Sequence, residues 1–308
     1  NKWEFHNLKK LNVVFGGCAR DCEKYIPKVM ENIDLYSSFF NNCYKIVVEN
    51  GSKDNTKNLL NKYKTKNDFI FIREDLSKYT YRGKRLEHAR NLIIDTIRNN
   101  EILRSCDLFI ALDFDDRNLD IIETENFVRA INFLISKEQI GAVFANQIGI
   151  YYDMWGLIDE KYCKVDFWVN CLKKIAKKTN PNEQISQELL NNFQKDLDDN
   201  RLSFDPSSEP IKVKSAYGGF GIYKIDKVLK NQRKYKGDQK VELIFKDGTK
   251  KNIFYQKNEI VNFNLGFSDI KSDLYILPYL INKMDSQCHF PLRAAFSLII
   301  NENSSLNI

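Results

Sequence analysis

The chain has 308 residues, of which 43% are hydrophobic and 29% charged, a composition that supports a hydrophobic core and excludes a disordered protein. Its 47 basic and 41 acidic residues give a net charge of +6, which a lysine-rich surface accounts for, so we expect no nucleic-acid partner. No apolar run approaches the roughly 20 residues that cross a bilayer, and seven scattered cysteines favour reduced thiols. We therefore expect a cytoplasmic protein with no transmembrane segment in this chain. Because the chain begins at Asn1 rather than Met, a membrane anchor or a neighbouring domain upstream stays open.

The first half of the chain alternates strand-like and helix-like segments with short connections, which is typical of a parallel sheet covered by helices. We predict strands at 11–15, 44–48, 69–72, 107–112 and 142–145, and helices at 22–35, 57–63, 84–98 and 123–136. The segment 107–112 is almost wholly apolar, as expected for a strand at the centre of such a sheet. The pattern predicts the α/β class.

The second half is less regular. Residues 166–200 are rich in lysine and asparagine and predict a helical insertion on one side of the molecule rather than core. Residues 241–255 predict a β-hairpin, because Asp247-Gly248 separates two alternating segments. With no internal repeat and no linker, we expect one domain over 1–308, with insertions at about 166–200 and 238–257.

Carboxylates cluster directly after the central strand, at Asp113-Phe114-Asp115-Asp116. Open α/β sheets bind ligands at the carboxyl ends of their strands. Alternate residues of an extended chain point the same way, so Asp113 and Asp115 could share one divalent cation with substrate phosphates. The alternative is an acidic turn that caps the next segment, which the tripeptide alone favours. The apolar strand before it shifts the balance toward a metal site.

Two further segments carry chemistry. Glu49, Asn50 and Ser52 follow the second strand, where an acidic or amide side chain could hydrogen-bond a base or a ribose; a plain turn with a helix cap is the alternative. The run from Arg82 to Arg90 opens a helix, where guanidinium groups can bind phosphate, although a solvated basic face is the commoner arrangement. Arg90 directly precedes an apolar stretch and is expected to face inward.

These segments, in this order and spacing, resemble nucleotide-sugar glycosyltransferases of the GT-A fold, and most closely the capsule-associated (alpha-1,3-)mannosyltransferase-like family. The resemblance covers roughly residues 11–265, with gaps. It is carried by residues 17–21, 49–52, Arg82, Ala89-Arg90-Asn91, Asp113, Asp115, 152–155 and 215–223. The combination is more specific than any one motif.

The resemblance implies a GT-A (Rossmann-like) fold with a mostly parallel central sheet flanked by helices. Residues 11–150 would bind the nucleotide sugar and residues 151–308 the acceptor. A DXD motif, Asp113 and Asp115, would hold Mn²⁺ or Mg²⁺ against the diphosphate of a GDP- or UDP-sugar donor. Glu49 would contact the nucleoside, with Asn50 and Ser52 in the same turn.

The resemblance also gives roles to residues elsewhere in the sequence. Arg82 or Arg90 would support the donor phosphates or the acidic motif. The sugar and acceptor side would be lined by Tyr152, Asp153, Trp155, Gly218 and Gly219. In an inverting enzyme a carboxylate would act as general base on the acceptor hydroxyl, whereas a retaining enzyme needs no protein base.

One position departs from the family pattern. The family often has Cys-Glu-His where this chain has Asn258-Glu259-Ile260, so Glu259 is kept and the histidine is absent. The two candidates for the general base are Asp153 and Glu259. His289 is the one histidine left open for a role, since His6 and His88 are expected to be structural.

The expected function is metal-dependent transfer of a hexose, in a mannosyltransferase-like manner, from a nucleotide sugar to a glycan or other hydroxyl acceptor in polysaccharide biosynthesis. Two alternatives stay open. A nucleotidyltransferase acting on sugar phosphates would show a glycine-rich basic loop after its first strand, of which residues 16–20 are a poor version. A non-catalytic glycan-assembly protein is disfavoured by the intact Asp113 and Asp115 pair.

Overall fold

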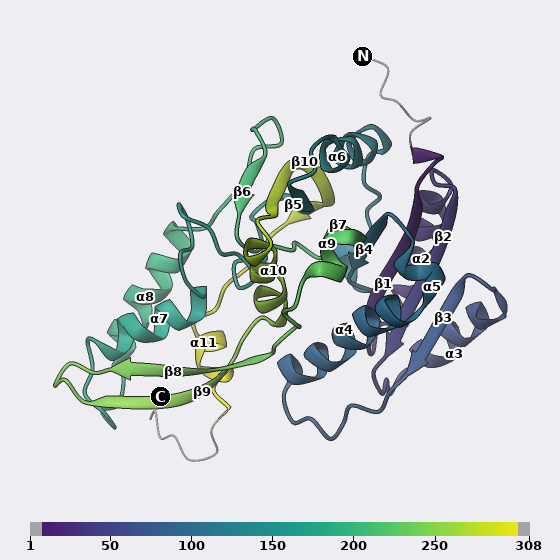
Figure 1. The fold of residues 1–308 in the computed structure, drawn as a ribbon. Helices are drawn as coiled ribbons and strands as arrows, with labels where there is room; N and C mark the ends of the chain where they lie inside the picture. Colours follow the sequence, from purple (N-terminus) through teal and green to yellow (C-terminus); the bar gives the residue numbers. More distant parts are fainter. Residues whose placement is uncertain (1–7, 301–308) are drawn as a thin grey trace.

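The computed structural model describes residues 8–300, apart from the side chain of Thr65; His6 lies outside these residues. An eight-stranded sheet in the order β3-β2-β1-β4-β7-β5-β10-β6 forms its centre (Figure 1). The pairings β3-β2, β2-β1, β1-β4 and β5-β10 are parallel, whereas β7 and β6 run antiparallel to their neighbours. The strands are β1 Asn12–Ala19, β2 Asn42–Glu49, β3 Phe69–Arg73, β4 Leu108–Leu112, β5 Ile140–Gly149, β6 Ile211–Val213, β7 Phe220–Lys224 and β10 Asp273–Ser286. This confirms the predicted α/β class with a mostly parallel central sheet.

Helices cover both faces of the sheet. They are α2 Ile26–Ser37, α3 Thr56–Asn61, α4 Arg82–Asn99, α5 Glu101–Arg104, α6 Thr124–Ser136, α7 Phe167–Ala176, α8 Gln187–Asp199, α9 Ile225–Lys230, α10 Glu259–Asp269 and α11 Arg293–Ser297, with short 3-10 helices η1 Lys62–Thr65 and η2 Asp116–Asn118. Successive side chains of a strand point to opposite faces. Val13 accordingly packs in the core with α2 and α6, and Val14 in the core with α4 and α10. Within residues 8–300 no helix has both the length and the apolarity to span a membrane.

The first strand is longer than predicted, because Gly16 and Gly17 continue it to Ala19. A β-carbon at Gly17 would lie 2.5 Å from the carbonyl oxygen of Leu112 and 2.5 Å from the ring of Phe114. The two glycines therefore allow β1 and the chain after β4 to approach closely. The predicted strand ends at these two glycines, whereas the observed strand continues through them. Their lack of side chains permits the close packing.

The segment 166–200 forms two helices, α7 and α8, as predicted, but it is part of the core. Trp168 and Leu172 of α7 belong to the same hydrophobic cluster as Val14 of the central sheet. The apolar side chains of α7 lie on one face of the helix and are buried, although the segment as a whole is polar in composition. The prediction followed the overall composition and missed this buried face.

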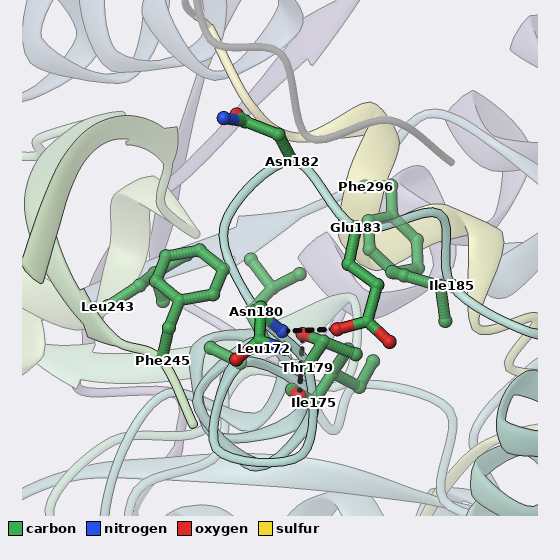
Figure 2. Close-up of a pocket in the computed structure, with 11 residues that line it drawn as sticks. Leu172, Ile175, Thr179, Asn180, Asn182, Glu183, Ile185, Leu243, Phe245 and Phe296 are labelled. Carbon is green, nitrogen blue, oxygen red and sulfur yellow. Dashed lines mark hydrogen bonds between the residues drawn. The ribbon is translucent and has the colours of Figure 1, made fainter. Parts of the chain in front are cut away.

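The predicted hairpin is confirmed as β8 Asp238–Ile244 and β9 Lys250–Gln256, which lie beside α7 and α11 and away from β1 to β3 (Figure 1). Figure 2 shows the crevice between this hairpin and α7, where Leu172 faces Leu243 and Phe245. Its volume of about 10 Å³ is about that of one water molecule. The crevice is a packing seam with no room for a substrate.

Candidate functional site

The carboxyl ends of β1, β2 and β4 and the start of α4 enclose a cavity of about 230 Å³, called here the strand-end cavity. Four of the predicted site residues line it: Asn50, Arg82, Asp113 and Asp115. Arg20 and Arg85 add two more guanidinium groups to its wall. The lining thus combines the carboxylates of Asp113 and Asp115 with three arginines, a charge pattern that suits a cation bound together with phosphate groups.

Asp113 is held at the junction of the sheet and the cavity. Its backbone N–H donates to the carbonyl oxygen of Gly219 over 3.0 Å, because β7 runs antiparallel beside β4. Its carboxylate Oδ1 accepts from Arg90 Nη2 at 3.0 Å and from the Tyr217 hydroxyl at 3.3 Å. The other carboxylate oxygen, Oδ2, is available to a ligand. It lies near Gly219, since a β-carbon on that residue would be 3.5 Å from it.

Arg90 is buried behind Asp113, as the apolar stretch after it predicts. Its Nε donates to Glu259 Oε1 over 2.7 Å, and its guanidinium lies 4.8 Å from the centre of the Tyr217 ring. Burial alone lowers the pKa of Arg90, but the phenol and the two carboxylates around it raise that pKa well above its usual value. A buried guanidinium of this kind needs both carboxylates. Glu259, itself buried, is therefore committed to an ion pair.

Asp115 forms the acidic turn that the sequence left open as the alternative to a metal site. Its Oδ1 accepts from the backbone N–H of Arg117 over 2.9 Å and so caps η2. Burial, and then the neighbouring Asp113 carboxylate, raise the pKa of Asp115 to about 6. Two adjacent carboxylates that destabilise each other's charge are a fitting donor set for a divalent cation.

No protein residue in the described part of the chain completes a larger metal site. Within residues 8–300 there is no group of three or more His, Cys, Asp and Glu side chains placed to hold a metal ion. Mg²⁺ commonly takes one or two carboxylates from the protein and its other ligands from water and substrate phosphates. Asp113 and Asp115 fit that kind of site, and they do not fit a closed structural one.

The Glu49-to-Ser52 turn is divided between two cavities. Asn50 faces the strand-end cavity, and its side-chain Oδ1 is buried without a hydrogen-bond partner among the described residues. Glu49 Oε1 accepts from the backbone N–H of Ser52 at 2.5 Å, which is the local turn that the sequence offered as the alternative. Glu49 and Ser52 line an adjoining open cavity of about 560 Å³, together with Asp75. Asn50 is thus the residue of this turn whose side-chain oxygen lacks a hydrogen-bond donor among the described residues.

Asp153 forms a buried cluster with Gly218 and Gly219, called here the Asp153 wall, and none of the three is among the residues that line the strand-end cavity. Its Oδ2 accepts from the backbone N–H of Gly218 at 3.1 Å, and its Oδ1 accepts from Gly156 N at 3.1 Å and Asn258 Nδ2 at 3.3 Å. Burial raises the pKa of Asp153 to about 7, even though these hydrogen bonds oppose the shift. A carboxyl with such a pKa can exchange a proton near neutral pH.

Gly218 and Gly219 adopt backbone φ angles of +65° and +78°. A β-carbon at Gly219 would lie 2.6 Å from the hydroxyl oxygen of Tyr152 and 3.5 Å from Asp113 Oδ2. The glycines are needed for the left-handed backbone, and Gly219 is needed also for the close approach of the Tyr152 hydroxyl.

Three buried amides that the sequence did not single out hold this glycine pair. Asn282 Nδ2 donates to the carbonyl oxygen of Gly218 at 2.8 Å, and Gln147 Nε2 to the same oxygen at 3.1 Å. Asn118 Nδ2 donates to the carbonyl oxygen of Gly219 at 2.9 Å. Asn118 could have been noticed in the sequence, since it follows the acidic cluster. Gln147 and Asn282 lie on β5 and β10, far from any motif that the sequence showed.

The two described histidines lie outside the strand-end cavity. His88 contacts the ring of Tyr79 and lies 3.8 Å from Glu74. His289 is 62% exposed, and its Nδ1 lies 3.4 Å from Arg201 Nη2. His289 is therefore placed at the surface beside an arginine.

No protein-family model matches the chain, and no curated protein matches its sequence. Among solved structures, the chain is similar to Mycobacterium tuberculosis glucosyl-3-phosphoglycerate synthase in complex with Mn²⁺, uridine diphosphate and glucosyl-3-phosphoglycerate, at 12% identity and a TM-score of 0.45, over 97% of this chain and 81% of that one. It is similar to S. aureus TarS 1–349 at 12% identity and a TM-score of 0.42, over 87% of this chain but 58% of that one. It is also similar to a Pyrobaculum calidifontis mannosyltransferase in complex with GDP-Man and Mn²⁺, at 11% identity and a TM-score of 0.34, over 74% and 48% of the two chains.

Proposed function

We propose that the chain is a metal-dependent glycosyltransferase that moves a sugar from a nucleoside-diphosphate donor to a hydroxyl group of a glycan or other acceptor. The observation that carries this proposal is the strand-end cavity, whose lining combines Asp113 and Asp115 with Arg82 and Arg85. A donor diphosphate with its cation would match both sets of charges. Asn50, with its unpartnered side-chain oxygen, would accept from a hydroxyl or amine of the nucleoside.

Asp113 and Asp115 would hold Mn²⁺ or Mg²⁺ in this cavity, and Arg82 would bind the donor phosphates. When bound, the cation would stabilise the negative charge of the departing nucleoside diphosphate. Arg90 has a different part, because its buried pairing with Asp113 and Glu259 fixes the orientation of Asp113.

Of the two candidates for a general base, we favour Asp153. Glu259 is paired with Arg90, and protonation of Glu259 would leave a buried guanidinium with one carboxylate fewer. Asp153 has a pKa near 7 and lies beside Gly218, next to Asp113. In an inverting reaction the acceptor hydroxyl would lose its proton to an oxygen of Asp153.

The sequence motifs support a more specific form of this proposal. Residues 49–52, 89–91 and 215–223 resemble the capsule-associated mannosyltransferase-like family, which favours a hexosyltransferase using a GDP- or UDP-sugar in polysaccharide biosynthesis. We take the chain to be one domain, in which 11–150 bind the donor and 151–308 the acceptor.

A thermal-shift screen of nucleoside diphosphates and nucleotide sugars, with and without Mn²⁺, tests the proposal. We expect the melting temperature to rise only when Mn²⁺ and one class of nucleoside diphosphate are both present. Asp115→Asn should remove the shift, whereas Asp95→Asn, a surface change of the same kind on α4, should keep it. A wild-type protein that none of these ligands stabilises in the presence of Mn²⁺ is not a glycosyltransferase of this type.

A further inference from the structure

The start of α4 carries two of the arginines of the strand-end cavity, Arg82 and Arg85. Arg85 Nη1 donates to the carbonyl oxygen of Tyr79 at 2.8 Å, which fixes its side chain. The Arg82 side chain has no hydrogen bond or ion pair to another residue within 8–300. The place of its guanidinium therefore depends on the backbone of α4 at its first turn.

The segment that leads into the hairpin, residues 235–238, lies along α4. Asn91 Nδ2 donates to the carbonyl oxygen of Tyr235 at 3.1 Å, and the Tyr235 N–H donates to Asn91 Oδ1 at 3.0 Å. One turn closer to the helix start, the Gly237 N–H donates to Glu87 Oε2 at 2.8 Å. This segment thus follows the helix from its middle toward its first turn.

Two glycines from distant parts of the sequence bring the two backbones into contact at that first turn. A β-carbon at Gly237 would lie 2.1 Å from the carbonyl oxygen of Gly83, and one at Gly83 would lie 2.6 Å from the carbonyl oxygen of Gly237. Both glycines are buried. A side chain at either position would force the start of α4 away from the hairpin.

The open end of the hairpin supplies what the first turn of α4 lacks. Tyr81, the N-cap residue, makes no side-chain hydrogen bond to the turn. Instead Gln256 Oε1 accepts from the Gly83 N–H at 3.3 Å and so caps α4 from β9. Asp238, which lies opposite Gln256 in the hairpin, accepts from the Tyr81 hydroxyl at 2.6 Å. The hairpin and the start of α4 therefore meet at this pair of residues (Figure 1).

Packing against the core holds only the later part of α4. Its buried hydrophobic side chains are Ala89, Ile93, Ile94 and Ile97. Of residues 82–88 only Gly83 is buried, and its close neighbour is the hairpin. The contacts with the hairpin therefore decide where the first turn lies.

We propose that Asp238 and Gln256 are positioning residues for donor binding, because they hold the start of α4 where Arg82 meets the donor phosphates. This inference rests on the proposed function, which places those phosphates in the strand-end cavity. Neither Asp238 nor Gln256 lines the cavity, so both act through the helix. When the helix start is loosened, fewer molecules have Arg82 in place, and the apparent affinity falls by that fraction.

Isothermal titration of GDP and, in parallel, of UDP at saturating Mn²⁺ tests the proposal. We expect Asp238→Ala and Gln256→Met each to weaken the nucleotide that binds wild type by about fivefold, the usual loss for one hydrogen bond. Glu242→Ala removes another carboxylate of β8, which pairs with Lys250 across the hairpin, and should leave binding unchanged. Thermal melting of each variant checks that it is folded.

A double-mutant cycle with Arg82→Met separates positioning from a general loss of stability. In the Arg82→Met background, Asp238→Ala should weaken binding by less than about twofold, because the side chain through which it acts is gone. A residue that only stabilises the fold would weaken binding by the same factor in both backgrounds.

Hydrogen exchange of the unliganded protein tests the same contact without a nucleotide. The amide of Gly83 should exchange about fivefold faster in Asp238→Ala than in wild type, since the hydrogen bond that holds Tyr81 is lost. An unchanged exchange rate would show that the hairpin does not hold the start of α4.

The proposal is also overturned if both variants bind the nucleotide within about twofold of wild type, or if Asp238→Ala costs the same factor with and without Arg82→Met. If neither GDP nor UDP binds the wild-type protein with Mn²⁺, the proposed glycosyltransferase function fails instead. The exchange rate of Gly83 then still decides whether Asp238 holds the start of α4.

Discussion

The strand-end cavity and the Asp153 wall meet at Asp113, but they are built in different ways. The cavity takes its residues from strand ends and one helix start within the first 115 positions, and its charged groups are partly open to solvent. The Asp153 wall takes residues from positions 153 to 258 and holds them by buried hydrogen bonds. The first arrangement suits a charged ligand, and the second, being more deeply buried, raises the pKa of Asp153 to about 7.

The largest effect should come from removing charge in the cavity. Asp113→Asn should lower sugar transfer by at least about 100-fold, because a group aimed at developing charge contributes on that scale. Asp115→Asn should do the same. Steady-state rates at saturating Mn²⁺ measure the loss, with Asp95→Asn as the matched surface control. Full transfer by either variant, or undiminished transfer in EDTA, contradicts a metal site at this motif.

The buried ion pair behind the cavity should matter for stability more than a surface pair. Glu259→Gln should lower the free energy of unfolding by about 3 kcal/mol, because it leaves the buried Arg90 with only one carboxylate. Glu242→Gln breaks the exposed pair with Lys250 and should cost less than about 1 kcal/mol. Urea unfolding of both variants measures the difference. Equal costs would mean that Arg90 does not depend on Glu259.

Gly219 of the Asp153 wall can be compared with Gly248 of the hairpin turn, which has a similar backbone angle but no close neighbour. Gly219→Ala should cost about 3 kcal/mol, because the backbone strain at φ +78° adds to a contact of 2.6 Å with the Tyr152 hydroxyl. Gly248→Ala, at φ +85° in the hairpin turn with open space around it, should show the strain of about 1 kcal/mol alone. Thermal unfolding of the two variants gives both values. Similar losses would show that Gly219 serves only the backbone.

The last effect is the pH dependence of stability at the Asp153 wall. The pKa of Asp153 is about 7 in the folded protein, above the ordinary value of 3.8, so the folded state binds this proton more tightly than the unfolded state. Its contribution is full below about pH 4 and is lost as the pH rises to about 7. Asp153→Asn should remove this part of the decline. Parallel urea titrations of wild type and variant between pH 4 and 8 test it, and identical slopes would argue against a raised pKa.

The two regions also differ in how much of each could be predicted from the sequence. The placement of Asp113, Asp115, Asn50 and Arg82 around one cavity follows from the rule that parallel strands end at one edge of the sheet. The inward position of Arg90 follows from the apolar residues after it. Each of these inferences needs only a local pattern and the sheet class.

The rest depends on contacts that no local pattern records. The hydrogen bonds of Asn282 and Gln147 to Gly218 join β10 and β5 to the start of β7, and the pairing of Glu259 with Arg90 spans 169 residues. Long-range packing, which sets these distances, is decided by the whole core rather than by any one segment.

The most direct test of the central claim is a crystal structure of the chain with Mn²⁺ and the nucleoside diphosphate that stabilises it. We predict an anomalous manganese peak within coordination distance of Asp113 or Asp115 and the diphosphate, with the phosphates directed toward Arg82 and Arg85. A nucleotide bound elsewhere on the molecule, or a metal peak away from both carboxylates, would contradict the proposed site.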